Sequence, residues 1–500
     1  MTFHMKAEER QQLDRMFNPR GFALFGGVST PASFGQFVLL SHIRYGYKGC
    51  LYPISSKGGE IAGLKIYKRL SDVEGPVDLA SISLPAKAVP GVLQECLNCG
   101  VAGVQIHSSG FGETGRPEDA AIEAEVVRIA AQGIRVIGPN CFGIHTPKGG
   151  ITLLPGFDFS REPGPVGMIS QSGGVATDLG HEAPALGFGL SKVISFGNGC
   201  DLEAAGLLEY LAEDPETLYI VAYLEGVGNG RKFIDVLRRT TVKKPVVIWK
   251  AGLTPLGGRA ALSHTGSMSG EVRVWDGVLS QAGAAPVQGL DEILDTLVAL
   301  TYLKHIGPRI AFLGGGGAIG VFSSDLANRW GLKVPVFSPE TRKRLRNFFP
   351  TPGNSMMNPL DTGSPALPVK TITALCEEIL IREPVDVLIV VVLLRTLEVE
   401  MPSFYAMDSP EPGGNGSYLR GFIEPLVGLK KETGKEVVMV FDNRAHLSTE
   451  AGVEAVSRKM RDRFQDAGIP VYSSTERALR GIYHALVSLR AHSPRTLQQR

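Results

Sequence analysis

His264 stands in a segment made of small, hydroxylated and glycine residues, Arg259-Ala-Ala-Leu-Ser-His-Thr-Gly-Ser-Met-Ser-Gly270. The segment has neither the alternation of a strand nor the apolar stripe of a helix, which predicts an exposed, tightly folded loop. A neutral imidazole in such a loop is a good nucleophile towards phosphorus, and its N-phosphoryl product passes the group on readily. A lone histidine is more often a surface or helix-capping residue, so the hypothesis depends on partners elsewhere in the chain.

Two glycine-rich turns offer such partners, because each follows an apolar run and precedes a helical pattern. The unpaired N–H groups at such a helix start, together with the helix dipole, favour an anion. No Gly-Lys-Ser/Thr follows either turn, so neither is a Walker A loop. Tight packing also requires glycine, which leaves that alternative open for each turn taken alone. The candidate phosphate-binding residues are Ser170, Ser172, Gly173 and Gly174 in the first turn, and Gly315, Gly316 and Gly317 in the second.

A third turn, Gly26-Gly-Val-Ser-Thr-Pro-Ala-Ser-Phe-Gly35, follows the first apolar run, where dinucleotide-binding folds keep their phosphate loop. It is not a GxGxxG sequence, and no acidic residue ends the next strand to hold an NAD ribose. That strand leads instead into Pro53-Ile-Ser-Ser-Lys57, which offers hydroxyls and a cation. The pattern favours a phosphorylated nucleotide other than NAD, although Lys57 alone is equally well explained as a solvated lysine.

Composition narrows the class of protein. The 500 residues exceed what one hydrophobic core can organise and predict about three domains. The net charge of +1, without a dense Lys/Arg run, argues against a nucleic-acid partner. The cysteines are scattered, and the lone pair Cys96 and Cys99 predicts neither a disulfide framework nor a metal site. Residues 1–18 lack the apolar core of a signal peptide, and the apolar run 387–394 is too short to span a membrane, so we expect a cytoplasmic protein.

Short apolar runs alternate with helical patterns through most of the chain, as in parallel sheets with crossover helices. We therefore expect an α/β protein of three consecutive units, over residues 1–145, 146–305 and 306–490, followed by a polar tail over 491–500. The Pro/Gly-rich stretch 146–165 is expected to be a linker. The expected strands are 21–25, 49–54, 77–84, 103–106, 135–140, 166–169, 191–195, 218–224, 245–249, 309–313, 385–394 and 436–441.

Several motifs occur in a fixed order along the chain: Tyr52-Pro-Ile-Ser-Ser-Lys-Gly-Gly-Glu60, Pro85-Ala-Lys-Ala-Val-Pro90, Gly138-Pro-Asn-Cys-Phe-Gly143, Ser170-Gln-Ser-Gly-Gly174, Leu224-Glu-Gly226, Ser263-His-Thr-Gly-Ser267 and Asn358-Pro-Leu-Asp361. In these motifs the chain resembles the NDP-forming acyl-CoA synthetases, relatives of succinyl-CoA synthetase. It is most similar to the α subunits of ADP-forming acetate–CoA ligases, from about residue 19 to 489. The resemblance implies a Rossmann-like CoA-binding domain followed by two flavodoxin-like ligase domains.

The resemblance also implies roles for single residues. His264 matches the histidine that is phosphorylated, and Glu225 matches the glutamate that orients it, a role in which a carboxylate stabilises an imidazolium. The two helix starts at residues 172–174 and 315–317 would grip the phosphoryl group. The residues expected near CoA are Gly26, Ser29, Ser33, Lys57, Pro85 and Asn140.

Two departures from the family pattern affect these expectations. The turn over residues 26–35 lacks the lysine that relatives carry there, which puts the usual phosphate contacts of CoA in doubt. The sequence also shows no ATP-grasp domain, the part that binds the nucleotide in this family. We therefore expect an ATP-grasp β subunit as partner in a hetero-oligomer, with ATP or ADP and Mg²⁺ bound on that subunit.

The sequence thus predicts the α subunit of an acid–CoA ligase that interconverts acyl-CoA, phosphate and NDP with acid, CoA and NTP. Acyl phosphate and phosphohistidine would be the intermediates, which splits one hard step into easier ones. One alternative is a regulatory protein that responds to CoA or acyl-CoA without turnover. A protein acyltransferase is a second alternative, although we find no acetyltransferase-type segment.

Overall fold

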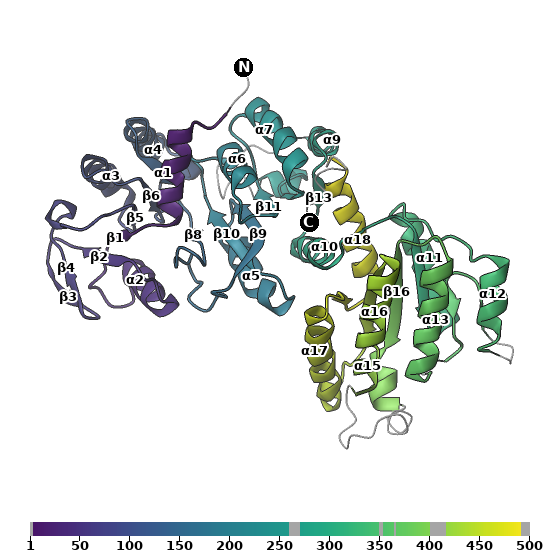
Figure 1. Cartoon of the computed structure of the whole chain (residues 1–500). Helices are drawn as coiled ribbons and strands as arrows, with labels where there is room; N and C mark the ends of the chain where they lie inside the picture. Colours follow the sequence, from purple (N-terminus) through teal and green to yellow (C-terminus); the bar gives the residue numbers. More distant parts are fainter. Residues whose placement is uncertain (1–3, 260–270, 350–353, 365–366, 401–416, 492–500) are drawn as a thin grey trace. The chain divides into compact units, whose positions relative to one another are not determined.

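β-Sheets with mostly parallel strands, covered by helices, build the two units into which the chain divides (Figure 1). The computed structural model describes residues 4–259, 271–349, 354–364, 367–400 and 417–491. The first unit comprises residues 1–290 and 488–499, and the second comprises residues 291–487 and 500. None of the described helices is long and apolar enough to cross a lipid bilayer.

The first unit begins with a sheet in which all neighbouring strands are parallel. The order across this sheet is β2 (Cys50–Ile54), β1 (Gly21–Phe25), β5 (Leu79–Ile82), β6 (Gly103–Ile106) and β7 (Arg135–Ile137). The helices of this part are α1 (Ala7–Phe17), α2 (Phe34–Tyr45), α3 (Val89–Asn98) and α4 (Pro117–Ala130), and a small hairpin is formed by β3 (Gly59–Ile61) and β4 (Leu64–Ile66).

The first unit also holds a second, larger sheet. Its order is β13 (Ala285–Val287), β12 (Val246–Lys250), β11 (Tyr219–Leu224), β9 (Pro163–Ser170), β10 (Leu190–Ser195) and β8 (Gly143–His145). Only the β10–β8 pair of this described sheet is antiparallel. The accompanying helices are α5 (Gly173–Ala185), α6 (Ala204–Glu213), α7 (Gly230–Lys243) and α9 (Val272–Ala282).

The second unit is built on a third parallel sheet. Its order is β15 (Leu360–Asp361), β14 (Ile310–Gly314), β16 (Val387–Leu393), β17 (Glu436–Asp442) and β18 (Val471–Tyr472). Figure 1 shows α13 and α16 side by side over these strands. The helices are α10 (Leu290–Tyr302), α11 (Gly317–Arg329), α12 (Pro339–Arg346), α13 (Val369–Arg382), α15 (Ser417–Arg420), α16 (Ile423–Thr433), α17 (Ala451–Asp466) and α18 (Thr475–Leu489).

All three sheets are wound in the same way. In each, the first long strand lies between the second and the third, so the winding direction reverses beside strands β1, β9 and β14. At such a reversal the crossover helices leave the two neighbouring strands towards opposite faces of the sheet, which opens a crevice at the carboxyl ends of the strands. The fold therefore provides three crevices of one kind, each next to a glycine-rich turn.

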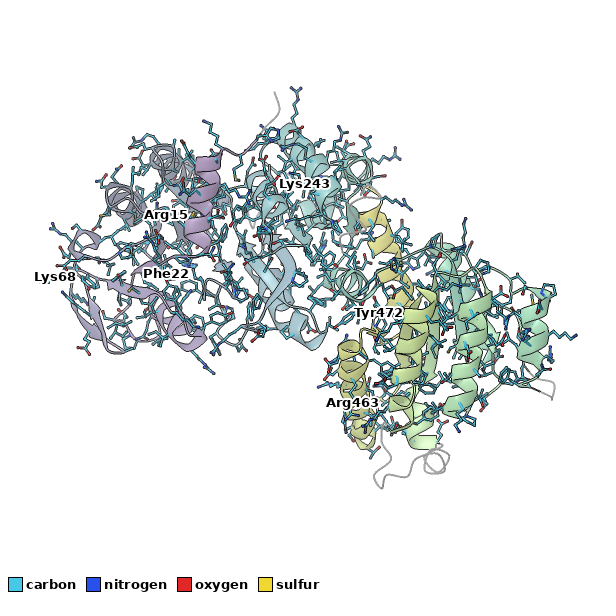
Figure 2. The ribbon with its side chains drawn as sticks, viewed as in Figure 1. Arg15, Phe22, Lys68, Lys243, Arg463 and Tyr472 are labelled. Atoms are coloured by element: carbon cyan, nitrogen blue, oxygen red, sulfur yellow. The ribbon has the colours of Figure 1, made fainter. Side chains whose placement is uncertain are left out.

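Local sequence explains where the helices beside these turns begin and how they pack. Helix α2 is capped at its start by Ser33, whose Oγ accepts a hydrogen bond from the N–H of Gln36, and at its end by Gly46, which has a left-handed φ of 89°. Phe22 in β1 is fully buried and lies inside the first unit in Figure 2, whereas Lys68 is exposed. The apolar strands, covered by helices, thus form the hydrophobic core around each sheet.

The expected strands are all present, within a few residues of their predicted ends. The strands that the sequence did not predict, β3, β4, β8, β13, β15 and β18, have two or three residues each, which is too short for a periodic pattern. The stretch 146–165 is no exposed linker, because Ile151 and Leu154 lie in the hydrophobic core and β9 already begins at Pro163. Residues 143–145 pair with β10 of the second sheet. The domain limits expected at 145/146, 305/306 and 490/491 stay predictions.

Buried histidines, His42 and His145 among them, make the stability of the first unit depend on pH. His42 is fully buried and His145 is 1% exposed, and burial lowers the pKa of His42 to about 4 and that of His145 to about 3. Their pKa in the unfolded chain is about 6.5, so the unfolded state takes up protons first as the pH falls. Stability from these residues is therefore complete above about pH 6.5 and is lost progressively towards about pH 4 for His42 and about pH 3 for His145.

We expect His145→Phe to reduce this loss, because a phenyl ring keeps the edge contacts with Tyr45 and Phe159 and cannot be protonated. The measurement is the free energy of unfolding from urea titrations at several pH values between 7 and 4. His446→Phe, at an exposed histidine, is the control and should leave the dependence unchanged. An equally steep fall in His145→Phe and in the unmodified chain would contradict the assignment.

Candidate active site

The crevice of the second sheet brings together two of the predicted site segments. Ser170 ends β9 and Glu225 directly follows β11, and these two strands are neighbours on either side of the reversal in winding. Both segments therefore leave the same edge of the sheet next to each other, although they are far apart in the sequence. The structure thus places Glu225 beside the turn over residues 170–174.

Gln171 connects these two segments directly. Its side-chain Oε1 accepts hydrogen bonds from the backbone N–H groups of Glu225 (2.5 Å) and Gly226 (2.9 Å). Its backbone N–H donates to the carbonyl of Tyr223 (3.1 Å). Gln171 is 6% exposed, so water competes little for these bonds. One side chain thus holds the backbone of the glutamate to the glycine turn.

The Glu225 side chain is buried, with 5% of its surface exposed. Its Oε1 accepts a hydrogen bond from the Tyr223 hydroxyl at 3.2 Å. Lys250, at the end of β12, lies close by: its Nζ donates to the Glu225 carbonyl at 2.8 Å and also to the carbonyl of Ala251. Burial lowers the pKa of Lys250, and the nearby Glu225 carboxylate opposes that shift. An acidic and a basic side chain therefore lie close together in a buried part of the second sheet's edge.

The turn over residues 170–174 is held by its own hydroxyl groups. Ser170 Oγ donates to the Ser172 carbonyl (2.6 Å) and accepts from the Ser172 N–H (3.1 Å), so its hydroxyl hydrogen is already used. Ser172 is the N-cap of α5, where its Oγ accepts from the N–H of Val175. The N–H groups of Gly173 and Gly174 lie in the first helical turn, where no intrahelical acceptor exists. These two glycines are therefore the donors best placed for an external anion.

The glycine turn of the third sheet already has an anion of its own. The Asp361 Oδ1 accepts hydrogen bonds from the N–H groups of Gly316 and Gly363, both at 2.9 Å. Gly316 is the N-cap of α11, with φ of 136°, a conformation that favours glycine. A phosphate at Gly315, Gly316 and Gly317 would meet the charge of Asp361 at this helix start. Of the two predicted phosphate turns, that of residues 170–174 is thus the one without an internal carboxylate at its glycines.

The turn over residues 26–35 lies at the crevice of the first sheet, after β1. Gly26 has a φ of 103°, and a side chain there would overlap the backbone of Ser83. The Ser33 hydroxyl donates to the Gly27 carbonyl at 2.5 Å, so it serves the turn itself. Ser29 is exposed and is the predicted CoA contact in this turn that faces solvent.

The other residues predicted for CoA follow neighbouring strands of the first sheet. Lys57 and Pro85 are exposed beyond β2 and β5, the strands on either side of β1. Asn140 lies beyond β7 at the sheet's edge, with a left-handed φ of 57° and its N–H donating to the Ser108 carbonyl at 2.9 Å. Gly26, Lys57 and Pro85 therefore follow three adjacent strands at one edge of the sheet, and Asn140 follows β7 further along the same edge.

His264 lies outside the residues that the structure describes, so its place relative to Glu225 stays a prediction. Three residues that sequence reasoning did not assign have clear roles in the described part: Gln171, Lys250 and Asp361. Gln171 and Asp361 stand inside motifs already singled out, and Lys250 is a charged residue that ends an apolar strand. Two phenylalanines lie near this site: Phe196 is a core residue at 2% exposure, whereas the ring of Phe142 lies over Gly173.

Two domain families match the chain. Residues 20–147 match the family described as CoA binding domain, and residues 163–300 match the family described as succinyl-CoA ligase like flavodoxin domain. The first match spans the first sheet, and the second spans the long strands of the second sheet with Ser170 and Glu225.

Whole-chain comparisons agree with these domain matches. The ADP-forming acetate–CoA ligase II subunit alpha of Pyrococcus furiosus is 35% identical over 93% of this chain and 95% of the relative. The ADP-forming acetate–CoA ligase of Methanocaldococcus jannaschii is 35% identical over 70% of this chain but only 49% of its own length. The structure named dinucleotide forming acetyl-coenzyme A synthetase 1 of Ca. Korarchaeum cryptofilum, in complex with phosphate and ADP, has a TM-score of 0.79 and 30% identity, covering 97% of this chain and 98% of that one.

The ring of Phe142 gives a stability test of the turn over residues 170–174. A Cβ at Gly173 would overlap that ring, whereas a Cβ at Gly174 would find its nearest neighbour, Ser172 Oγ, at 3.7 Å. We expect Gly173→Ala to cost about 1–3 kcal/mol of unfolding free energy through overpacking. Gly174→Ala should instead be neutral or stabilising by up to about 1 kcal/mol, from helix propensity.

The measurement is urea unfolding of both variants, and Phe142→Ala supplies the control. In that background the cost of Gly173→Ala should largely disappear, as a double-mutant cycle would show. Equal stability of the two glycine variants would contradict the packing described here.

Proposed function

This chain belongs to the family of ADP-forming acetate–CoA ligase α subunits, and we propose that its own residues carry the route from acyl-CoA to phosphohistidine. It is an acid–CoA ligase of the nucleoside-diphosphate-forming type. The relatives reported above are named as ligases or synthetases, and none is described as a regulator or a protein acyltransferase. The observation that carries the proposal is the hydrogen bond that the Glu225 N–H donates to the side chain of Gln171. It joins the predicted glutamate to the predicted phosphate turn.

The proposed reaction has three balanced steps. A phosphate oxygen attacks the thioester carbonyl, the C–S bond breaks, and acyl phosphate and CoA form. The imidazole of His264 then attacks phosphorus, the bond from phosphorus to the acyl oxygen breaks, and the acid leaves as carboxylate. ADP finally takes the phosphoryl group, the P–N bond breaks, and ATP and free histidine result. Each step avoids a direct reaction between acyl-CoA and the nucleotide.

The residues of the second sheet suit the first two steps. The N–H groups of Gly173 and Gly174, at the positive end of α5, would hold the attacking phosphate and then the phosphoryl group. The buried Glu225 carboxylate would accept a hydrogen bond from the imidazole N–H. It would thereby stabilise the positive charge that develops when the ring attacks phosphorus. Lys250 balances the charge of that carboxylate and braces its backbone. Positioning and charge neutralisation would thus supply most of the catalysis.

We propose that CoA binds at the crevice of the first sheet. The match of residues 20–147 to a CoA binding domain supports this site, as does the position of Gly26, Lys57 and Pro85 around one reversal of winding. Exposed Lys57 would supply the cation for a phosphate group of CoA, and Ser29 a hydroxyl. Ser33 would act indirectly, because its hydroxyl already holds the turn.

We propose that an ATP-grasp β subunit supplies the nucleotide site, together with the Mg²⁺ that accompanies ATP and ADP. Two findings support this: the Pyrococcus relative is named a subunit alpha, and the chain spans about half of the Methanocaldococcus relative, whose name mentions no subunit. Mg²⁺ would neutralise the nucleotide phosphates during transfer. The complete enzyme would then be a hetero-oligomer.

The phosphohistidine is tested by labelling. Incubation with acetyl-CoA and radioactive phosphate should give a protein-bound label that is labile in acid and stable in base. We expect His264→Asn to abolish the label because no nucleophile for phosphorus is left. His446→Asn, which changes an exposed histidine, is the matched control and should label normally. Persistent labelling of the His264 variant would refute the assignment.

The need for a partner is tested by nucleotide synthesis. With acetyl-CoA, phosphate, ADP and Mg²⁺, the purified chain should form phosphohistidine but no ATP. Adding an ATP-grasp β subunit of the same enzyme type should restore ATP formation. Rapid ATP synthesis by the purified chain alone would show that it holds a nucleotide site of its own.

A further inference from the structure

A loop of the second sheet reaches over to the first sheet and contacts it through several hydrogen bonds. The loop is Phe196-Gly-Asn-Gly-Cys-Asp201, directly after β10. At its start, the N–H of Phe196 donates to the Ser170 carbonyl at 2.8 Å. Further on, the N–H of Asn198 donates to the Pro139 carbonyl at 3.0 Å. The loop therefore touches both the proposed phosphate turn and the segment that contains Asn140.

The close approach of these segments depends on Gly197. Its φ is 53°, and a Cβ there would overlap the carbonyl oxygens of Pro139 and Asn140. A residue with a side chain would separate the two loops. The glycine thus lets the loop after β10 lie directly on the backbone after β7, and it places the side chain of Asn198 over the first sheet.

The Asn198 side chain binds two carboxylates beside the first sheet, Glu113 in the loop over residues 107–115 and Glu123 in helix α4. Its Nδ2 donates to Glu113 Oε2 at 2.7 Å and to Glu123 Oε2 at 3.0 Å. Carboxylates only accept hydrogen bonds, so this amide must present its NH₂ group to them. Its Oδ1 is then shielded from solvent and has no hydrogen-bond partner among the described residues. The two hydrogen bonds to the glutamates offset the desolvation penalty of the unpaired oxygen.

The same two glutamates hold the loop over residues 107–115. Glu113 Oε1 accepts from the N–H groups of Gly110 (2.6 Å) and Phe111 (3.2 Å), and Glu123 Oε2 accepts from the N–H of Gly112 (3.2 Å). The next link is the Asn140 N–H, which donates to the Ser108 carbonyl in this loop. Asn198 therefore connects the second sheet by hydrogen bonds to a loop at the carboxyl edge of the first sheet.

We infer that Asn198 is a positioning residue that holds the loop over residues 107–115 in register with the phosphate turn over residues 170–174. This inference rests on the proposed function. The first step requires the thioester of CoA, bound at the first sheet, to meet a phosphate bound at the second. A shift of reacting groups by about 1 Å costs about a hundredfold in rate. Asn198 acts on that first alignment and takes no part in transfer between His264 and the nucleotide.

The test separates the two ends of the reaction, using the full chain with its ATP-grasp partner. Phosphohistidine is formed either from acetyl-CoA and labelled phosphate or from γ-labelled ATP, and the rates are measured separately. We expect Asn198→Ala to slow the acetyl-CoA route about 10- to 100-fold, the loss expected for misaligned reactants. Labelling from ATP should stay unchanged. Asn98→Ala, at the exposed end of α3, is the matched control and should alter neither route.

Charge variants sharpen the test. Asn198→Asp replaces the donor by a third carboxylate beside Glu113 and Glu123, so it should slow the acetyl-CoA route more than Asn198→Ala does. Adding Glu113→Gln to Asn198→Asp restores one donor and one acceptor between the two side chains and should recover much of the rate. Recovery of this kind is not expected from general loss of structure.

The outcomes are distinct. Loss of the acetyl-CoA route alone, with rescue by the double variant, supports the inference. Equal slowing of both routes, or no change in either, overturns it, because the residue would then be structural or dispensable. Absence of labelling from both sources in the unmodified chain would instead refute the proposed function itself.

Discussion

The parallel strands of a sheet end at one edge, and where the winding reverses, the connections of two neighbouring strands leave towards opposite faces of the sheet. The helices that begin there present N–H groups without an intrahelical acceptor. This constraint decides where chemistry can occur in the chain. The three described sheets share the same winding, with reversals beside β1, β9 and β14. Each reversal stands next to a glycine-rich turn, so the proposed sites for CoA and phosphate follow from repeated use of one topology.

The three turns nevertheless differ in what occupies them. In the turn over residues 170–174, serine hydroxyls brace the backbone and leave the N–H groups of Gly173 and Gly174 without an intrahelical acceptor. At α11, Asp361 accepts the Gly316 N–H and brings a negative charge. The turn at β1 is closed by Ser33, whose hydroxyl bonds to Gly27. Similar glycine patterns therefore serve different chemistry, because the neighbouring side chains decide whether the turn favours or opposes the binding of an anion.

Connections between these sites depend on a few polar side chains, of which Gln171 and Lys250 are buried and Asn198 is partly buried. Gln171 ties Glu225 to the phosphate turn, Lys250 ties the ends of β11 and β12, and Asn198 ties the second sheet to a loop of the first. The hydrogen bonds of Gln171 and Lys250 lie where water is scarce, which makes them directional and costly to break. A reaction with a transferred phosphoryl group needs such rigidity, since its reactants must be aligned before charge develops.

Much could be predicted from the sequence alone, including the α/β class, the long strands and the order of the glycine turns, because apolar periodicity and glycine spacing are local properties. Glu225 and Ser170 were predicted as site residues, and the structure brings their two segments together at one edge of the second sheet. The family resemblance was confirmed. The roles of Gln171, Lys250 and Asn198 were not predictable, since each acts on residues distant in sequence. The packing of residues 146–165 into the core was missed for a related reason: proline and glycine mark turns, yet whether a turn is buried depends on which sheet lies against it. Strand order, and with it the meeting of distant loops at one edge, is decided only when the tertiary structure forms.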